Sequence, residues 1–420
     1  MRPVTRDSSG AEQRALAALD HESLAEDASR LVKVASVTGD ERAALERLGE
    51  TAESCGLRAE CHRYDLPALR AARGYPGEVA KRKDLFGLTV TVPGWDPAAP
   101  RFCVNGHVDV VNPGSRPWER DPWSGCIEDG RLHGRGSADM KGGLTAGLHA
   151  LASIQAAGGA RGDIVLEAVS SEEDGGLGAF AALERDEDFA GALIPEPTGL
   201  DVVCAQAGSL LFEGFVYGRS AHAAMRLEGV SAIDRYIPLH QAMRAYESEV
   251  NANVENELMR ALTLPYPISV GQVEAGEWQG QVPDRLRFTG RLGVPIGACV
   301  QQARARFERV LTAAFDAVGP PVDLRWTGTF RPSATATGHA LVTLAQRALA
   351  DELRRPVGIA GVPWGADMQH FCARGIPCVM LGPSGIARAH AVDEYVELDE
   401  LVVVARAIIR ILLRFGEATV

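Results

Sequence analysis

The fold is decided by the stretch Phe102–Gly143, FCVNGHVDVVNPGSRPWERDPWSGCIEDGRLHGRGSADMKGG. It begins with an almost wholly apolar run that ends in His107 and Asp109, and a glycine-rich turn near its end carries Asp139. Such an apolar run is typical of a strand that is buried on both faces of a sheet. Because open α/β sheets bind ligands at the carboxyl ends of their strands, these polar residues predict a site there.

Strand-like and helix-like segments alternate on both sides of this stretch. Apolar residues at helical spacing predict two helices between residues 21 and 55. Strands are expected at 57–66, 85–94, 100–111, 163–176 and 191–199, and helices at 142–158, 177–186, 339–353 and 397–415. This alternation predicts an α/β fold in which a mostly parallel sheet is flanked by helices.

The pattern changes near Gly208. From there the chain shows β-α-β-β-α-β order, with segments at 209–223, 229–250, 266–275, 284–294, 299–318 and 322–330. That order is typical of a ferredoxin-like α+β domain, and its size is sufficient for an inserted domain. We therefore expect a discontinuous domain, residues 1–208 and 326–420, interrupted by an inserted domain, residues 209–325.

Composition restricts the class of protein. The chain has 420 residues, 46% of them hydrophobic, which is enough for a large core and two domains. A net charge of -12 and the lack of a Lys/Arg stripe argue against a nucleic-acid-binding surface. Eight cysteines scattered singly fit a reducing compartment, and neither a secretory signal nor a membrane-spanning run is visible. We expect a cytoplasmic protein.

Five residues are candidate metal ligands, because each follows an apolar run or lies in a Gly/Pro turn: His107, Asp139, Glu173, Glu196 and His390. Each alone is more often structural, since a histidine at a strand end is usually hydrogen-bonded and an acidic turn is usually solvated. Together they form a mixed nitrogen and oxygen set. Such a set suits two Zn²⁺, Co²⁺ or Mn²⁺ ions about 3.5–4 Å apart.

Two further acidic residues are expected to support these ligands. Asp109 lies two residues after His107 on the same side of the strand, so it is predicted to accept the second ring proton of that histidine. Glu172 precedes Glu173, so one carboxylate of the pair can bind metal while the other acts as a general base.

Several motifs, in order over nearly the whole chain, carry a family resemblance. They are GHVDVV (106–111), WERDPW (118–123), GRGSADMKGG (134–143), SSEEDGG (170–176), PEPTG (195–199), GRSAHAAMRLEGVSAI (218–233) and AHAVDE (389–394). As a set they resemble the M20 family of co-catalytic metallohydrolases, relatives of acetylornithine deacetylase, succinyl-diaminopimelate desuccinylase and glutamate carboxypeptidase. The resemblance implies a zinc-exopeptidase-like catalytic domain with an inserted lid and dimerisation domain.

The resemblance also implies roles for the metal ligands. It places two divalent ions in each subunit, with Zn²⁺ as the first choice and Co²⁺ or Mn²⁺ as alternatives. His107 and Glu196 would hold one ion, and Glu173 and His390 the other. Asp139 would bridge the two ions.

Further roles follow from the same resemblance. Glu172 would be the general base. The protein would be a homodimer through the inserted domain, and His222 would reach the active site of the partner subunit to stabilise an oxyanion. From its place in the turn GRSAHA alone, His222 would be read as a turn residue.

The segment that binds a substrate carboxylate in many family members departs from their pattern. Gly280 stands where they have an asparagine, and Gly293 where they have an arginine. Arg291 lies two residues earlier on the same face of a strand, so it is a substitute candidate for substrate binding. Trp364 is a second candidate, although the tryptophans are in general expected to pack in the core.

The function expected is hydrolysis of a linear amide, with an N-acyl amino acid as the first choice of substrate. Alternatives within the class are a dipeptidase or carboxypeptidase and a deformylase acting on an N-formyl aminopyrimidine. A protein outside this class of hydrolases, one that binds a metal or a partner without catalysis, could have the same fold. An exopeptidase acting on a carrier-protein-linked substrate would need a basic patch, and the run Lys81–Lys83 is expected to be a solvated loop instead. No nucleic-acid or membrane partner is expected.

Overall fold

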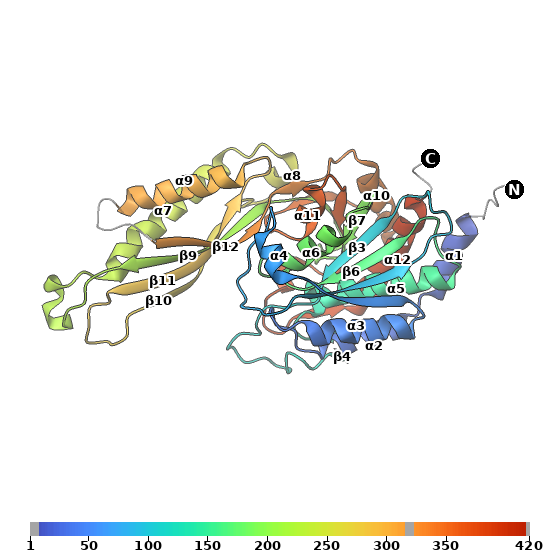
Figure 1. Ribbon diagram of the computed structural model, residues 1–420, viewed down its shortest axis with the longest axis horizontal. Helices are drawn as coiled ribbons and strands as arrows, with labels where there is room; N and C mark the ends of the chain where they lie inside the picture. Colours follow the sequence, from blue (N-terminus) through green and yellow to red (C-terminus); the bar gives the residue numbers. More distant parts are fainter. Residues whose placement is uncertain (1–7, 316–322, 417–420) are drawn as a thin grey trace. The chain divides into compact units, whose positions relative to one another are not determined.

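The computed structural model describes residues 8–315 and 323–416, which form two compact units (Figure 1). The first unit comprises Met1–Cys204, Thr335–Ala360 and His370–Val420, and the second comprises Ala205–Ala334 and Gly361–Gln369. The second unit is thus inserted in the chain of the first. The domain boundaries expected at 208/209 and 325/326, and the lid and dimerisation role of the insert, stay predictions.

The largest sheet has parallel strands at its centre and antiparallel strands at its edges. Its order is β1 (Arg58–Arg63), β2 (Phe86–Val92), β6 (Ile164–Val169), β3 (Phe102–His107), β7 (Gly191–Ile194), β15 (Cys378–Met380), β8 (Val202–Gln206) and β13 (Ser333–Ala334), with β14 (Ile359–Val362) beside β8. The pairings among β6, β3, β7 and β15 are parallel. The pairs β1–β2, β2–β6, β15–β8 and β8–β13 are antiparallel. The predicted α/β class with parallel central strands is confirmed.

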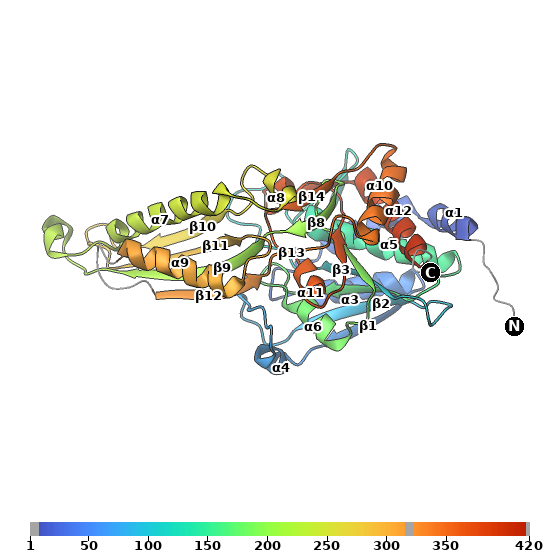
Figure 2. The same ribbon diagram turned by 90° about the horizontal axis from the view of Figure 1, so that it is seen from above.

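Helices cover this sheet on both faces, which explains why every residue of β3 and β6 is buried. The helix α5 (Gly142–Ala156) contacts β3 and β6, and α6 (Leu177–Arg185) contacts β6 and β2. Figure 2 shows α5 and α6 on opposite sides of β3. Around α5 pack α1 (Ser8–Ala18), α2 (His21–Val32) and α12 (Leu398–Phe415), which also contacts α10 (Ala340–Leu353). The sequence pattern missed α1, because its sequence SSGAEQRALAA has few apolar residues.

The remaining elements of the first unit are short, apart from α3. The helix α3 (Arg42–Ser54) contacts β1 and β2, and α4 (Leu66–Ala71) follows β1. A separate three-stranded sheet has the order β16 (Tyr395–Glu397), β5 (Arg131–His133) and β4 (Cys126–Glu128). Single turns form η1 (Ser137–Lys141) and η3 (Ile386–Arg388), and α11 (Met368–Cys372) lies at the boundary of the units.

The second unit has its own sheet and core. The strand order is β10 (Ile268–Ala275), β11 (Arg285–Val294), β9 (Gly208–Tyr217) and β12 (Asp323–Phe330), all antiparallel. With α7 (Ala232–Ala252), α9 (Val300–Phe315) and the short η2 (Ala223–Glu228) and α8 (Glu257–Arg260), the predicted β-α-β-β-α-β order is confirmed. Its core contains Phe212, Phe288 and Phe307. The predicted helix end at 316–318 and the strand start at 322 lie outside the described residues.

No helix within residues 8–315 and 323–416 combines the length and the apolar character that crossing a lipid bilayer requires.

Candidate metal centre

Three neighbouring parallel strands end at the same edge of the sheet, and the predicted ligands follow them. His107 is the last residue of β3, Glu172 and Glu173 follow β6, and Glu196 follows β7. In the sheet the order is β6, β3, β7, so these strand ends are adjacent (Figure 1). The carboxyl ends of parallel strands therefore gather the four side chains, as the sequence pattern predicted.

Asp139 lies between two histidines. Its Oδ1 is 3.3 Å from Nε2 of His107, and its Oδ2 is 3.4 Å from Nε2 of His390. The turn η1 carries Asp139 into this place, beginning after Gly136, whose φ of 84° is in the left-handed region that favours glycine. Each oxygen of one carboxylate thus faces a different imidazole.

The other carboxylates divide between the two histidines. On the side of His107, Nε2 lies 3.7 Å from Oε1 of Glu196 and 4.0 Å from Oε2 of Glu172. On the other side, Nε2 of His390 lies 3.1 Å from Oε1 of Glu173. His107 is 1% exposed and the side chain of His390 is 51% exposed, so the cluster is open to solvent beside His390. All these residues belong to the first unit.

Asp109 supports the cluster differently from the expectation. Nδ1 of His107 is 2.8 Å from the backbone carbonyl of Asp109 and 3.7 Å from its carboxylate, so the carbonyl is the nearer partner. The carboxylate is already engaged: it accepts the backbone N–H groups of Glu172 and Glu173 at 3.1 and 3.2 Å and the hydroxyl of Thr38. Asp109 therefore holds both the His107 ring and the turn that carries the two glutamates.

The sequence analysis missed Glu394 as a support of Asp139. Its Oε1 accepts the backbone N–H groups of Ala138 and Asp139 at 2.9 and 3.1 Å, and its Oε2 pairs with Arg135 at 2.6 Å. Both partners of this ion pair are buried. The sequence could have indicated Glu394, because it is the last residue of the motif AHAVDE, which also contains His390.

The expectation that Lys81–Lys83 is a solvated loop is wrong for Arg82. The Arg82 side chain is 1% exposed and pairs with Glu41 at 3.1 Å and with Asp174 at 3.3 Å. Asp174 also accepts the N–H groups of Val79 and Ala80 at 2.9 and 2.7 Å. This loop therefore stabilises the acidic turn after β6. The sequence could not predict this contact, because no local pattern distinguishes one buried arginine within a charged run.

The electrostatics of the cluster fit bound cations. Burial alone would lower the pKa of His107, but Asp139, Glu196 and Glu172 outweigh it and raise the pKa well above its ordinary value. Burial is likewise outweighed at His390, where Glu173 and Asp139 raise the pKa to about 11. The carboxylates thus favour positive charge at both rings. His107, Asp139 and Glu173 can present ligand atoms within 4.8 Å of one another.

Three residues that the sequence analysis assigned to the site belong to the second unit. Arg291 lies in β11 and its Nη2 donates to the carbonyl of Pro363 at 2.8 Å, next to the partly buried Trp364. His222 is exposed and caps η2, where its Nδ1 accepts the N–H of Ala224 at 3.1 Å. The ligand cluster belongs to the first unit, and the roles of these three residues stay predictions.

Comparison with known proteins supplies the family. The model of peptidase family M20/M25/M40 matches residues 103–414. A succinyl-diaminopimelate desuccinylase from Marinobacter nauticus is 31% identical over 316 residues, which cover 72% of this chain and 80% of the relative. An acetylornithine deacetylase from Yersinia pseudotuberculosis is 28% identical over 306 residues, which cover 70% of this chain and 73% of the relative.

A solved structure agrees in fold. The di-peptidase Dug1p from Saccharomyces cerevisiae has a TM-score of 0.80 at 14% identity, with 99% of each chain covered. At that identity the likeness concerns the fold alone. The family match and the candidate metal-ligand group together carry the conclusion: the chain belongs to peptidase family M20/M25/M40, and the protein is a metal-dependent hydrolase of amide bonds.

Proposed function

We propose that the protein is a dinuclear-metal deacylase that removes the acyl group from an N-acyl amino acid or a small N-acyl amine. The observation that carries the proposal is the position of Asp139, whose two oxygens each face one histidine. A carboxylate shared in this way suits a bridge between two ions. The relatives named as a desuccinylase and a deacetylase support the choice of acyl substrates.

The side chains divide into two sets of ligands. His107 and Glu196 would hold one ion, Glu173 and His390 the other, and Asp139 both. Zn²⁺ is the first choice, because imidazole and carboxylate ligands suit it, and Co²⁺ or Mn²⁺ are alternatives. Ions bound there would supply Lewis acidity for the substrate carbonyl and would lower the pKa of a water molecule.

Glu172 is the proposed general base. It is buried, and its backbone N–H is held by Asp109, which limits its movement. Its carboxylate takes a proton from the attacking water and delivers it to the nitrogen of the leaving amine. This transfer accounts for both proton movements that amide hydrolysis requires.

The wider setting is proposed as well. The protein acts in the cytoplasm, in keeping with eight cysteines that lie scattered singly along the chain. It forms a homodimer through the second unit, whose exposed His222 acts on the partner's site. Nδ1 of His222 accepts a backbone N–H, which leaves Nε2 as the ring donor for an oxyanion.

The test combines one substitution with a panel of substrates. Glu172→Gln is expected to keep about two metal ions per chain and to lower kcat by about 10³-fold or more, because only the proton acceptor is lost. Hydrolysis of N-acetylornithine, N-succinyl-diaminopimelate, dipeptides and N-formyl amines is measured with the metal-loaded enzyme. Faster turnover of dipeptides or formyl amines than of N-acyl amino acids would contradict the substrate class.

A matched control is Glu53→Gln, which alters an exposed glutamate of α3. It should retain both metal content and turnover. Normal turnover in the Glu172→Gln enzyme would show that the base is another group.

A further inference from the structure

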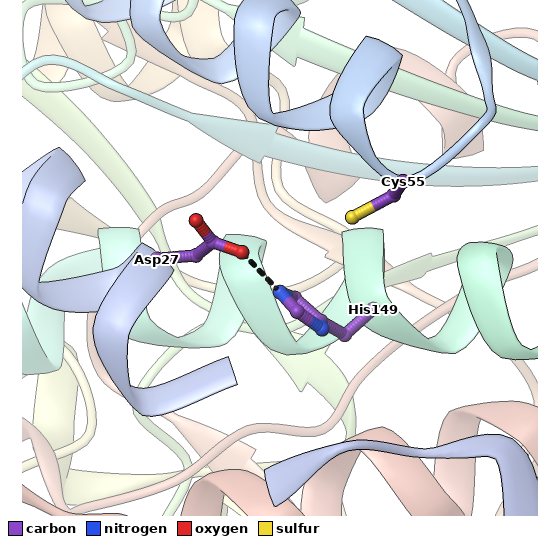
Figure 3. A group of neighbouring side chains, drawn as sticks. All are labelled: Asp27, Cys55 and His149. Atoms are coloured by element: carbon purple, nitrogen blue, oxygen red, sulfur yellow. Dashed lines mark hydrogen bonds and ion pairs between the residues drawn. The ribbon is translucent and has the colours of Figure 1, made fainter. Parts of the chain in front are cut away.

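A second group of metal-ligating side chains lies in the first unit, apart from the proposed hydrolytic centre. Asp27 belongs to α2, His149 to α5, and Cys55 directly follows α3. Figure 3 shows the three side chains directed toward one another from these helices. A carboxylate oxygen, a thiol sulfur and a ring nitrogen can all lie within 4.8 Å of one another. We propose that they form a separate site for one divalent metal ion of the zinc class.

A hydrogen bond between Asp27 and His149 fixes the relative position of two of the three side chains. Nε2 of His149 is 2.9 Å from Oδ2 of Asp27, and the two side chains are 5% and 6% exposed. Nε and Nη2 of Arg30 donate to the other oxygen of Asp27, at 3.1 and 2.6 Å. Hydrogen bonds of this kind orient metal ligands in known sites. Oδ2 is thereby directed at the imidazole, where an ion would lie between the two groups.

The donor set has the chemistry of a zinc site. Zn²⁺ is bound by thiolate sulfur, imidazole nitrogen and carboxylate oxygen, and three protein ligands leave one tetrahedral position for water. The charges of the Cys55 thiolate and the Asp27 carboxylate balance a divalent ion, and the imidazole is neutral. The guanidinium of Arg30, which pairs with the other oxygen of Asp27, is half exposed and keeps its charge in solvent. A neutral complex avoids the cost of a buried net charge. Coordination replaces the thiol proton, which passes to the solvent, and the neutral imidazole binds through Nε2 with its ring proton on Nδ1.

A nucleophilic cysteine is the rival role for a Cys, His and Asp group. That role requires the imidazole to take the thiol proton. Nε2 of His149 is paired with Asp27, and among the described residues no hydrogen bond joins the thiol of Cys55 to the imidazole of His149. Metal coordination fits the group better, because a bound ion displaces the proton directly.

The experiment uses the full-length protein freed of metal by a chelator and then titrated with Co²⁺. A thiolate bound to Co²⁺ gives a charge-transfer absorption in the near ultraviolet, and the ligands proposed for the hydrolytic centre contain no sulfur. We expect the band in the wild-type protein, with a stoichiometry of about one thiolate-bound ion per chain. Asp27→Asn should weaken Co²⁺ binding at this site by about tenfold or more.

Two cysteine variants decide the assignment. Cys55→Ser should abolish the band and remove one bound ion of the total, while the far-ultraviolet circular dichroism and the hydrolytic activity stay unchanged. Cys61→Ser alters an exposed cysteine of the neighbouring strand β1 and should keep the band. Absence of a band in the wild type at saturating Co²⁺, or its persistence in Cys55→Ser, would overturn the proposal. Neither result depends on the function proposed for the hydrolytic centre.

Discussion

Two carboxylates that are not proposed metal ligands hold the candidate centre in place. Asp109 accepts the backbone N–H groups of Glu172 and Glu173, and Glu394 accepts those of Ala138 and Asp139. Hydrogen bonds to ionised groups contribute about twice as much as neutral ones. At the scale of the residue, the positions of the proposed base and bridge therefore depend on these two acidic side chains.

Glu394→Gln tests this support at the bridge. Glutamine retains an acceptor for the amides but leaves the buried guanidinium of Arg135 without its counter-charge. We expect the free energy of unfolding to fall by about 3 kcal/mol, as when a buried ion pair loses one partner. Metal affinity should fall by about tenfold, because Asp139 is held less firmly. Urea denaturation and metal titration measure the two effects.

Glu397→Gln is the matched control for this substitution. Glu397 pairs with Arg131 at the surface, where the side chains are 28% and 44% exposed. An exposed pair contributes less than about 1 kcal/mol, so both readouts should stay near their wild-type values. Equal effects of the two substitutions would refute the special role of Glu394.

At the scale of the element, glycines let helices begin directly against the strand ends of the site. A Cβ on Gly143, in the first turn of α5, would lie 2.1 Å from the carbonyl oxygen of Pro195. A Cβ on Gly178, in the first turn of α6, would lie 2.1 Å from the carbonyl oxygen of Ser170. These contacts adjoin Glu196 and the acidic turn after β6. The close approach of helix to strand end thus helps to set the ligand positions.

Gly143→Ala should disturb this contact. The added methyl group meets backbone atoms of Pro195, which cannot move aside without shifting Glu196. We expect a loss of about 1–3 kcal/mol in the free energy of unfolding, as for overpacking of a core, together with weaker metal binding. Thermal unfolding of the metal-free protein and metal titration test the two parts separately.

Gly338→Ala provides the comparison, since no atom lies within 4 Å of the added group there. It should leave both measurements near their wild-type values. A Gly143→Ala protein as stable as this control would show that α5 can shift without cost.

At the scale of the whole molecule, the second unit has exposed apolar side chains despite its own complete core. Met225, Leu227 and Trp278 are 51%, 85% and 69% exposed. Met225 and Leu227 lie in η2, which His222 caps. Exposed apolar groups of this size are common at protein interfaces, which supports the proposed homodimer.

Subunit mixing tests whether His222 acts across such a dimer. His222→Ala and Glu172→Ala proteins should each be inactive, but a mixed dimer would contain one site with both an intact Glu172 and an intact His222 from the partner. Equal amounts with full exchange should restore about a quarter of the wild-type activity, because half of the dimers are mixed. Hydrolysis is measured before and after exchange.

A mixture of Glu172→Ala with Glu196→Ala is the control, since both changes lie in the first unit and neither site of the mixed dimer is complete. It should stay inactive. If the His222→Ala mixture also stays inactive although labelled subunits exchange, the action of His222 across the dimer is refuted.

The sequence alone determined the features that depend on neighbouring residues in the chain. The alternation of apolar strands and helices predicted the α/β class, and β-α-β-β-α-β order predicted the form of the second unit. Polar residues at strand ends predicted that His107, Glu173 and Glu196 would meet, because parallel strands end at a common edge. The helix α1 was not predicted, because it has too few apolar residues to show a helical spacing.

The tertiary structure decided every contact between residues that are distant in the chain. It showed that the backbone carbonyl of Asp109, and not the expected carboxylate, is the nearer partner of His107. It also showed that Arg82 is buried and paired with Asp174. It also brought together Asp27 of α2, His149 of α5 and Cys55, which directly follows α3. No spacing in the sequence marks such groups, because the packing of whole elements against one another, and not local backbone preference, sets which side chains meet.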